Sequence, residues 1–152
     1  MIDPLFKKLA FKQQSEVLVL GAPASFQLAL EKLPEESRVI SSLNQVDQVN
    51  YALVFVTQKM EIQEFAKSVQ QKIVGDATIW MCYPKGSSKK YRCDFNRDQG
   101  WEPMGEIGFE PVSQVAIDED WSALRFRNVH FIKTLHRNPQ SIMSEEGKAR
   151  IK

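Results

Sequence analysis

The residues best suited to contact a ligand follow an apolar segment in the middle of the chain. Residues 79–84 (IWMCYP) run directly into Lys85-Gly86-Ser87-Ser88-Lys89-Lys90. Lysine ammonium groups, serine hydroxyls and the main chain around a glycine can all contact an anion. A strand that ends in such a loop is typical of ligand sites in open α/β sheets. We therefore expect Lys85, Ser87, Ser88 and Lys89 to hold a small ligand that carries a phosphate or a carboxylate.

The alternative for this segment is a solvated loop whose lysines only keep the protein soluble. It is not a phosphate-binding P-loop, because the pattern G-x-x-x-x-G-K-[ST] is absent. The position of the loop favours the ligand-binding interpretation, because a second apolar run, residues 17–20, ends in Gly21-Ala22-Pro23-Ala24-Ser25. In a parallel sheet both loops meet at one edge, where Gly21 and Ser25 would join the crevice. Ser25, at the start of a helix, would add backbone donors; otherwise it is an ordinary first helical turn.

The Gly21 loop does not match a dinucleotide fingerprint. It lacks the second and third glycines of G-x-G-x-x-G, and Pro23 removes a backbone donor. The sequence therefore predicts neither NAD nor FAD nor S-adenosylmethionine, and the cofactor stays unknown.

Arg97 lies in a second polar loop, Asn96-Arg97-Asp98-Gln99-Gly100-Trp101. A guanidinium can bind a phosphate or a carboxylate through two parallel hydrogen bonds, so Arg97 is a further candidate ligand-binding residue. The alternative is an Arg97–Asp98 pair that only fixes the loop.

The densest acidic group is Asp118-Glu119-Asp120. Asp118 or Asp120 could act as acid or base in an enzyme, with Arg97 or Lys85 stabilising charge. Acidic residues are also ordinary turn residues, and no histidine or nucleophile is close in sequence. Strand alternation places Arg125 and Arg127 on one face, where pairing with this acidic turn is the simplest expectation.

Metal and thiol chemistry have little support. The two cysteines, Cys82 and Cys93, do not form a C-x-x-C pair, and the two histidines are His130 and His136. We predict no metal site. Cys82 lies in an apolar strand, where burial would raise its thiol pKa and make it unreactive.

Three buried strands alternate with helices along the first half of the chain. Residues 17–20, 51–56 and 77–83 are apolar runs, while residues 24–33 and 59–73 have apolar residues at helical spacing. Another short helix is expected from Pro4 to Ala10. Residues 112–117 and 122–126 read as a hairpin. The pattern predicts an α/β fold with three layers and a mostly parallel, Rossmann-like sheet that carries an antiparallel hairpin at its C-terminal edge.

Composition sets further limits on the protein class. The 152 residues are 43% hydrophobic and 26% charged, with a formal net charge of +1. This suits one globular domain, which we place at residues 1–137, followed by a polar tail at 138–152. Near-neutral charge argues against nucleic-acid binding. The sequence shows no secretory signal and no membrane span, so we expect a cytoplasmic protein whose oligomeric state the sequence does not fix.

Several segments resemble a family of small uncharacterised bacterial proteins, a domain of unknown function. They are IWMCYPKGSSKKY (79–91), NRDQGW (96–101), GFEPVSQVAIDEDWSALRFR (108–127) and the following FIKT. The resemblance covers residues 77–135 and implies a bacterial intracellular α/β domain. It implies no activity and no catalytic residues.

The leading hypothesis from the sequence is a binding domain for a small anionic ligand at the carboxyl edge of the sheet. One alternative is an enzyme that uses Asp118 or Asp120 as acid or base. The other is a protein-interaction module whose residues 143–152 dock a partner.

Overall fold

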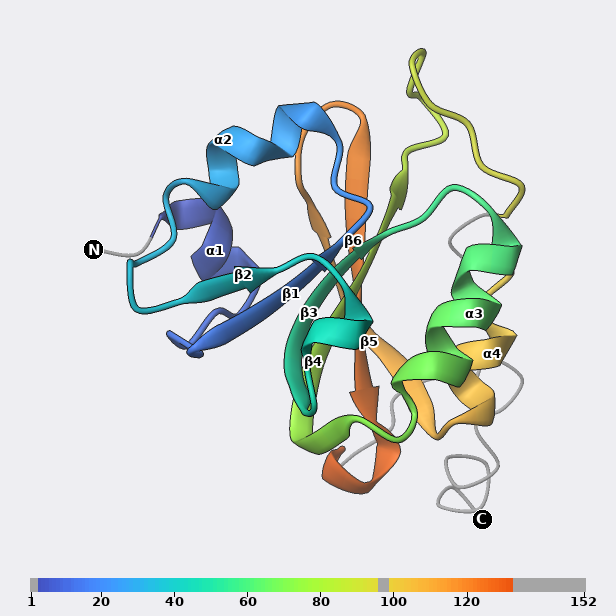
Figure 1. Ribbon diagram of the computed structural model, residues 1–152. Coiled ribbons are helices and arrows are strands. Elements are labelled where there is room, and N and C mark those ends of the chain that lie inside the picture. Colours follow the sequence, from blue (N-terminus) through green and yellow to red (C-terminus); the bar gives the residue numbers. More distant parts are fainter. Residues whose placement is uncertain (1–2, 96–98, 133–152) are drawn as a thin grey trace.

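A central six-stranded sheet organises the protein (Figure 1). The computed structural model describes residues 3–95 and 99–132. The strand order is β2-β1-β3-β4-β6-β5. The strands are β1 (Glu16–Leu20), β2 (Arg38–Ile40), β3 (Val49–Phe55), β4 (Ile73–Pro84), β5 (Phe109–Ala116) and β6 (Trp121–Asn128). Strands β2, β1, β3 and β4 are parallel neighbours, whereas β6 pairs with β4 and β5 in antiparallel fashion.

The hairpin formed by β5 and β6 adds the second half of the sheet. Ile79 pairs with Phe126 between β4 and β6, and Val115 pairs with Ala123 between β5 and β6. Strand β5, at the edge, thus runs in the same direction as the four parallel strands, and β6 alone is reversed. The predicted fold class, a mostly parallel Rossmann-like sheet with a C-terminal antiparallel hairpin, is confirmed.

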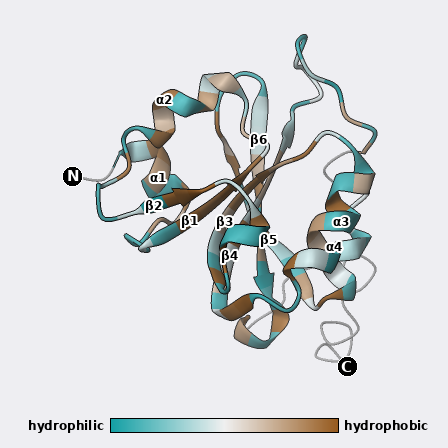
Figure 2. Ribbon diagram, viewed as in Figure 1, coloured by the Kyte–Doolittle hydropathy of each residue, from teal (hydrophilic) through white to brown (hydrophobic). Residues whose placement is uncertain are grey.

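Helices cover both faces of the sheet. Helices α1 (Pro4–Lys8) and α2 (Gln27–Leu30) lie on one side, and α3 (Lys59–Val69) and α4 (Glu102–Glu106) lie on the other (Figure 1). The brown, hydrophobic strands in the centre of Figure 2 are enclosed between these two layers. Each face has its own apolar cluster, with Phe6 of α1 and the following Leu9 in one and Ile62 and Phe65 of α3 in the other. The predicted three layers are therefore present.

The α1 side is fixed by polar groups as well as by packing. The Tyr51 hydroxyl and the Trp80 indole N–H both donate hydrogen bonds to the Leu9 carbonyl, at 2.8 and 2.7 Å. All three residues are buried. Burial raises the pKa of Tyr51, which keeps its hydroxyl protonated and able to donate. The end of α1 is thereby attached to two neighbouring strands.

Helix α3 begins with a capping box. The Gln58 side chain accepts from the backbone of Glu61, and the Glu61 carboxylate accepts from the Gln58 N–H at 3.0 Å. The helix ends at Val69, shorter than the predicted 59–73. Gly75, two residues beyond the predicted end, lies inside β4 at a φ of 57°, near a register shift against β3.

The predicted helix over residues 24–33 is mostly replaced by turns. A 3₁₀ turn spans Ala24–Phe26, and α2 keeps only four residues. None of the α2 residues is buried, and Leu28 is 70% exposed. Phe26, Ala29, Leu30 and Leu33 still pack against the core, so the apolar spacing identified the buried side of this segment but not its backbone conformation.

Candidate functional site

A crevice lies where β1 and β3 end side by side. From β1 the chain proceeds to β2 on one side and then returns to β3 on the other, so these two ends flank a topological switch point, the usual ligand position in open α/β sheets. The cavity, here called the β1–β3 crevice, has a volume of about 280 Å³. Its lining residues come from the ends of both strands, from α3 and from Leu43: Leu20, Gly21, Leu43, Val54, Phe55, Val56, Glu61, Glu64, Phe65 and Ser68.

Gly21 shapes the floor of the crevice. Its φ is +68°, and a Cβ at this position would lie 2.8 Å from the Phe55 carbonyl oxygen. The chain can therefore leave β1 this close to β3 only because residue 21 has no side chain. Gly21 is thus required by backbone geometry, whatever the crevice binds.

Among the described residues that line the β1–β3 crevice, the charged side chains are all acidic. The Glu61 carboxylate is already engaged, because it accepts hydrogen bonds from the N–H groups of Thr57 and Gln58 at 2.9 and 3.0 Å. Glu64 lies one helical turn further along α3, and it is exposed. Two carboxylates without a neighbouring lysine or arginine in the lining favour a cationic or hydroxyl-bearing ligand over an anion.

A second cavity lies beyond the ends of β4 and β6. This Tyr83 pocket has a volume of about 720 Å³. It is lined by Tyr83, Pro84, Lys85, Gly86, Ser88, Tyr91, Arg92, Cys93, Phe95, Gln114 and Ser122. Asp94, just behind the wall, accepts a hydrogen bond from the Lys59 N–H at 2.7 Å and donates its own N–H to the Thr57 carbonyl at 3.2 Å. The segment after the basic loop is thereby attached to the start of α3, between the two cavities.

The acidic hairpin turn holds the basic loop in place. The Ser88 hydroxyl donates to the Asp120 carboxylate at 2.8 Å, and the Lys85 N–H donates to the Asp120 carbonyl at 2.8 Å. Ser88 also accepts the Tyr91 N–H at 3.2 Å. Two groups that we expected to bind an anion are therefore already bonded to an aspartate of the chain itself.

The predicted site residues fall into different places. Gly21 lines the β1–β3 crevice, and Lys85 and Ser88 line the Tyr83 pocket. The two cavities share no lining residue. Ser25 lies in the 3₁₀ turn after Pro23, and Ser87 and Lys89 are exposed; none of these three lines either cavity. Arg97 lies outside the described residues.

The carboxylates proposed as acid and base have structural roles. Asp118 accepts hydrogen bonds from the N–H groups of Asp120 and Trp121, both at 2.8 Å, and so closes the turn. Asp120 holds Ser88, as described above. These contacts give both carboxylates a structural role and add no support to the alternative of an enzyme that uses Asp118 or Asp120 as acid or base.

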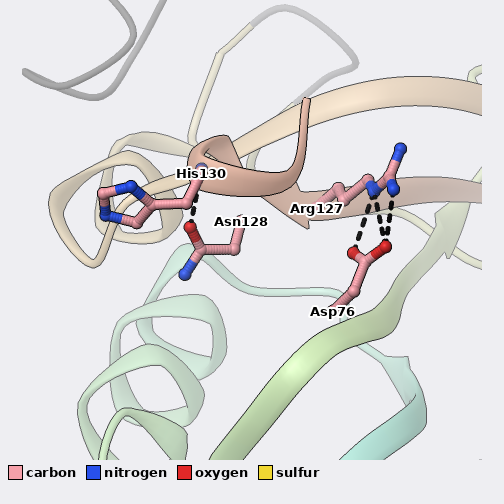
Figure 3. A network of polar contacts seen from close by, with 4 residues as sticks. All are labelled: Asp76, Arg127, Asn128 and His130. Carbon is pink, nitrogen blue, oxygen red and sulfur yellow. Dashed lines mark hydrogen bonds and ion pairs between the residues drawn. The ribbon is translucent and has the colours of Figure 1, made fainter. Parts of the chain in front are cut away.

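The arginines of β6 do not pair with the acidic turn. Arg127 donates hydrogen bonds from two guanidinium nitrogens to the carboxylate of Asp76 in β4 (Figure 3), and its Nε lies 2.8 Å from Asp76 Oδ1. These hydrogen bonds hold the pKa of Asp76 below its usual value. Nearby, Asn128 caps the next turn by accepting the His130 N–H at 2.9 Å. The Arg125 Nε is buried and has no hydrogen-bond partner among the described residues.

Neither cysteine offers a reactive site. Cys82 is fully buried, and burial raises the pKa of its thiol, as expected from the sequence. The Cys93 thiol donates to the Phe95 carbonyl at 2.9 Å. Within residues 3–95 and 99–132, no three of His, Cys, Asp and Glu gather as a metal site would require.

Sequence reasoning missed the acidic character of the β1–β3 crevice. The sequence gives only a weak indication of this acidic lining, because Glu61 and Glu64 look like ordinary solvent-exposed residues of an amphipathic helix. It also missed the aromatic walls of the Tyr83 pocket, since Tyr83, Tyr91 and Phe95 are brought together only by the path of the loop. Among the described helices, none is long and apolar enough to cross a bilayer.

The comparisons with known proteins show the fold. No family model matches the chain, and no curated protein matches it. A solved structure of an S-adenosylmethionine-dependent methyltransferase from Aquifex aeolicus resembles the chain with a TM-score of 0.59 at 13% identity, covering 84% of this chain and 95% of that one. A protein described as a type 11 methyltransferase from Sulfolobus solfataricus has a TM-score of 0.50 at 8% identity, covering 91% and 100%. The resemblance of residues 77–135 to uncharacterised bacterial proteins stays a prediction.

This likeness corrects our leading functional hypothesis. The expected binding domain for a phosphate- or carboxylate-bearing ligand is wrong, since the structures that share the fold are named for S-adenosylmethionine and methyl transfer. In the loop itself, the Ser88 hydroxyl and the Lys85 backbone N–H are already bonded to Asp120. The docking tail of the interaction-module alternative, residues 143–152, lies outside the described residues, and that alternative stays a prediction.

Proposed function

We propose that the protein binds S-adenosylmethionine in the β1–β3 crevice and is a methyltransferase. The observation that carries the proposal is a cavity at the switch point of the sheet whose charged lining side chains, Glu61 and Glu64, are both carboxylates. S-adenosylmethionine carries a positive sulfonium, a positive ammonium and one carboxylate, so its net charge is positive and carboxylates near the sulfonium suit it electrostatically. When bound, it supplies an electrophilic methyl group.

The residues of the crevice fit different parts of such a ligand. Val54, Val56 and Phe65 provide apolar wall, which suits a flat nucleoside base. Glu64 and Ser68 supply exposed oxygens on α3, which can accept hydrogen bonds from ribose hydroxyls or attract a cation. Gly21 keeps the space between the two strands free of a side chain.

Two features limit the expected affinity. The cavity of about 280 Å³ lies at the lower end of the range for small-molecule sites, so part of the ligand would stay in solvent. The loop after β1 also has Ala22 and Pro23 where a fingerprint would have further glycines. These departures were our reason for not predicting the cofactor from the sequence, and they favour a micromolar rather than a nanomolar complex.

Calorimetric titration with S-adenosylmethionine and with its product S-adenosylhomocysteine tests the proposal. Only the former has the sulfonium charge, so we expect it to bind more tightly to the unmodified protein. Glu64→Gln should weaken S-adenosylmethionine by about tenfold and reduce the difference between the two ligands. The matched control is Glu106→Gln, which neutralises an exposed carboxylate on α4 outside the crevice.

A second variant tests the location without touching charge. Ser68→Trp should fill the crevice and abolish binding of both ligands, because Ser68 is an exposed lining residue whose replacement leaves the core intact. Absence of binding heat with both ligands at millimolar concentration would refute the proposed function.

A cytoplasmic location remains a proposal, which cell fractionation would test.

A further inference from the structure

The Tyr83 pocket has no role in the proposed function, and its construction points to a ligand of its own. It is larger than the β1–β3 crevice, at about 720 Å³ against about 280 Å³, and it is within the usual size range of small-molecule sites. It opens at the same edge of the sheet, beyond β4 and β6.

Aromatic rings form its walls, and each is held by another ring. Tyr83 lies 6.1 Å from Phe95 and 5.5 Å from Trp101, measured between ring centroids. Phe95 is 5.0 Å from Trp101. Tyr91, on the loop, packs against Trp121 at 4.9 Å. Tyr83 and Phe95 are buried, at 5% and 8% exposure, so each presents only part of its ring to the pocket, whereas Tyr91 is half-buried. Rings fixed in this way need no further ordering when a planar ligand enters.

The side-chain amide of Gln114 is positioned to hydrogen-bond with the edge of such a ligand. The Gln114 Nε2 donates to the Tyr83 hydroxyl oxygen at 3.0 Å, which fixes the orientation of the amide. Its carbonyl oxygen makes no hydrogen bond to other described residues, and Gln114 lines the pocket. A carbonyl oxygen accepts, so the ligand should present an O–H or a ring N–H.

The charges around the pocket narrow the class further. Lys85 and Arg92 line it and would repel a cationic amine. The Lys85 ammonium and the Arg92 guanidinium would accept an anionic group as readily as a neutral one, whereas the Lys85 N–H and the Ser88 hydroxyl are already bonded to Asp120. The charges therefore disfavour only a cationic ligand.

We propose that the Tyr83 pocket binds a planar aromatic molecule that carries a hydroxyl or ring N–H donor, oriented by Gln114 between Tyr83, Tyr91 and Phe95. Phenols and indoles are members of this class.

Three probes of one shape test the class. We would titrate the full-length protein with 2-naphthol, 2-methoxynaphthalene and 2-naphthoate, and follow the backbone amide signals by NMR. The signals of Tyr91 and Cys93 should shift with 2-naphthol. 2-Methoxynaphthalene, which lacks the donor, should bind about tenfold more weakly, and 2-naphthoate, which lacks it as well, should bind more weakly than 2-naphthol.

Variants test the residue assignments. Gln114 is exposed on the edge strand, and Gln114→Ala should weaken the binding of 2-naphthol about tenfold while leaving the affinity for 2-methoxynaphthalene unchanged. Tyr91→Leu should weaken the binding of both ligands. Gln63→Ala, an exposed amide on α3 outside the pocket, is the matched control and should change neither.

Specific outcomes overturn the proposal. It fails if 2-naphthol causes no shifts at its solubility limit, if 2-naphthoate binds most tightly, or if Gln114→Ala weakens 2-naphthol and 2-methoxynaphthalene equally. None of these results affects the S-adenosylmethionine titration, because the two cavities have no residue in common.

Discussion

The two halves of the sheet edge form cavities in different ways. In the parallel half, the β1–β3 crevice is formed mainly by strand ends and by a glycine that lets them approach. In the half that contains the hairpin, the Tyr83 pocket is formed by a loop that is hydrogen-bonded to Asp120 in the turn between β5 and β6. The first cavity depends on backbone conformation and the second on hydrogen bonds between distant side chains. A mutation should therefore damage each by a different mechanism.

The largest expected effect is at Gly21. Gly21→Ala combines a positive φ with a contact of 2.8 Å to the Phe55 carbonyl oxygen, so we expect a loss of about 2–4 kcal/mol in the free energy of unfolding. Gly86→Ala is the control, because a Cβ there meets nothing within 4 Å. Urea denaturation measures both. Equal stabilities of the two variants would contradict a backbone origin for the crevice.

A smaller and more local effect is expected at Ser88. Ser88→Ala removes the hydrogen bond to Asp120 and the acceptor of the Tyr91 N–H, which should cost about 1–2 kcal/mol. Hydrogen exchange should accelerate at the Tyr91 and Lys85 amides and stay unchanged at Val54 in β3. Ser87→Ala, at an exposed neighbour, should alter neither stability nor exchange. Uniform acceleration across the sheet would show that the loop is not held separately.

Much of the fold could be predicted from the sequence, because its signals were local. The apolar runs at 17–20 and 51–56 are too short and too continuous for amphipathic helices, and they are buried strands. Helix α3 shows a clear apolar stripe. The extension of β4 back to Ile73 was missed, since Gly75 and Asp76 are typical turn residues and only pairing with β3 and Arg127 explains them.

The candidate sites were harder to predict, because they depend on contacts between distant residues. The Ser88–Asp120 hydrogen bond joins residues 32 positions apart, and it changes an apparent anion-binding loop into a closed turn. The acidic lining of the β1–β3 crevice depends on which face of α3 turns toward β1. The sequence pattern correctly predicted that Gly21 lies beside a cavity. It did not show that Lys85 lines a different cavity.

The smallest effect concerns the ion pair between β4 and β6. The pKa of Asp76 is lowered by its hydrogen bonds from Arg127, so the pair stabilises the fold above the usual carboxyl pKa of about 4 and this contribution disappears as the pH falls through the lowered pKa. Both side chains are about one-third exposed, which limits Asp76→Asn to a loss of about 0.5 kcal/mol at pH 7. Denaturation at pH 7 and pH 2 should show the difference from the unmodified protein shrinking with acid. A constant difference would refute the assignment.

The most direct test of the central claim is an amide NMR titration of the protein with S-adenosylmethionine. We predict that the signals of Gly21, Val56 and Phe65 shift in a saturable way, while those of Tyr91 and Cys93 stay in place. Shifts confined to Tyr91 and Cys93, or no shifts at millimolar ligand, would contradict a cofactor site between β1 and β3.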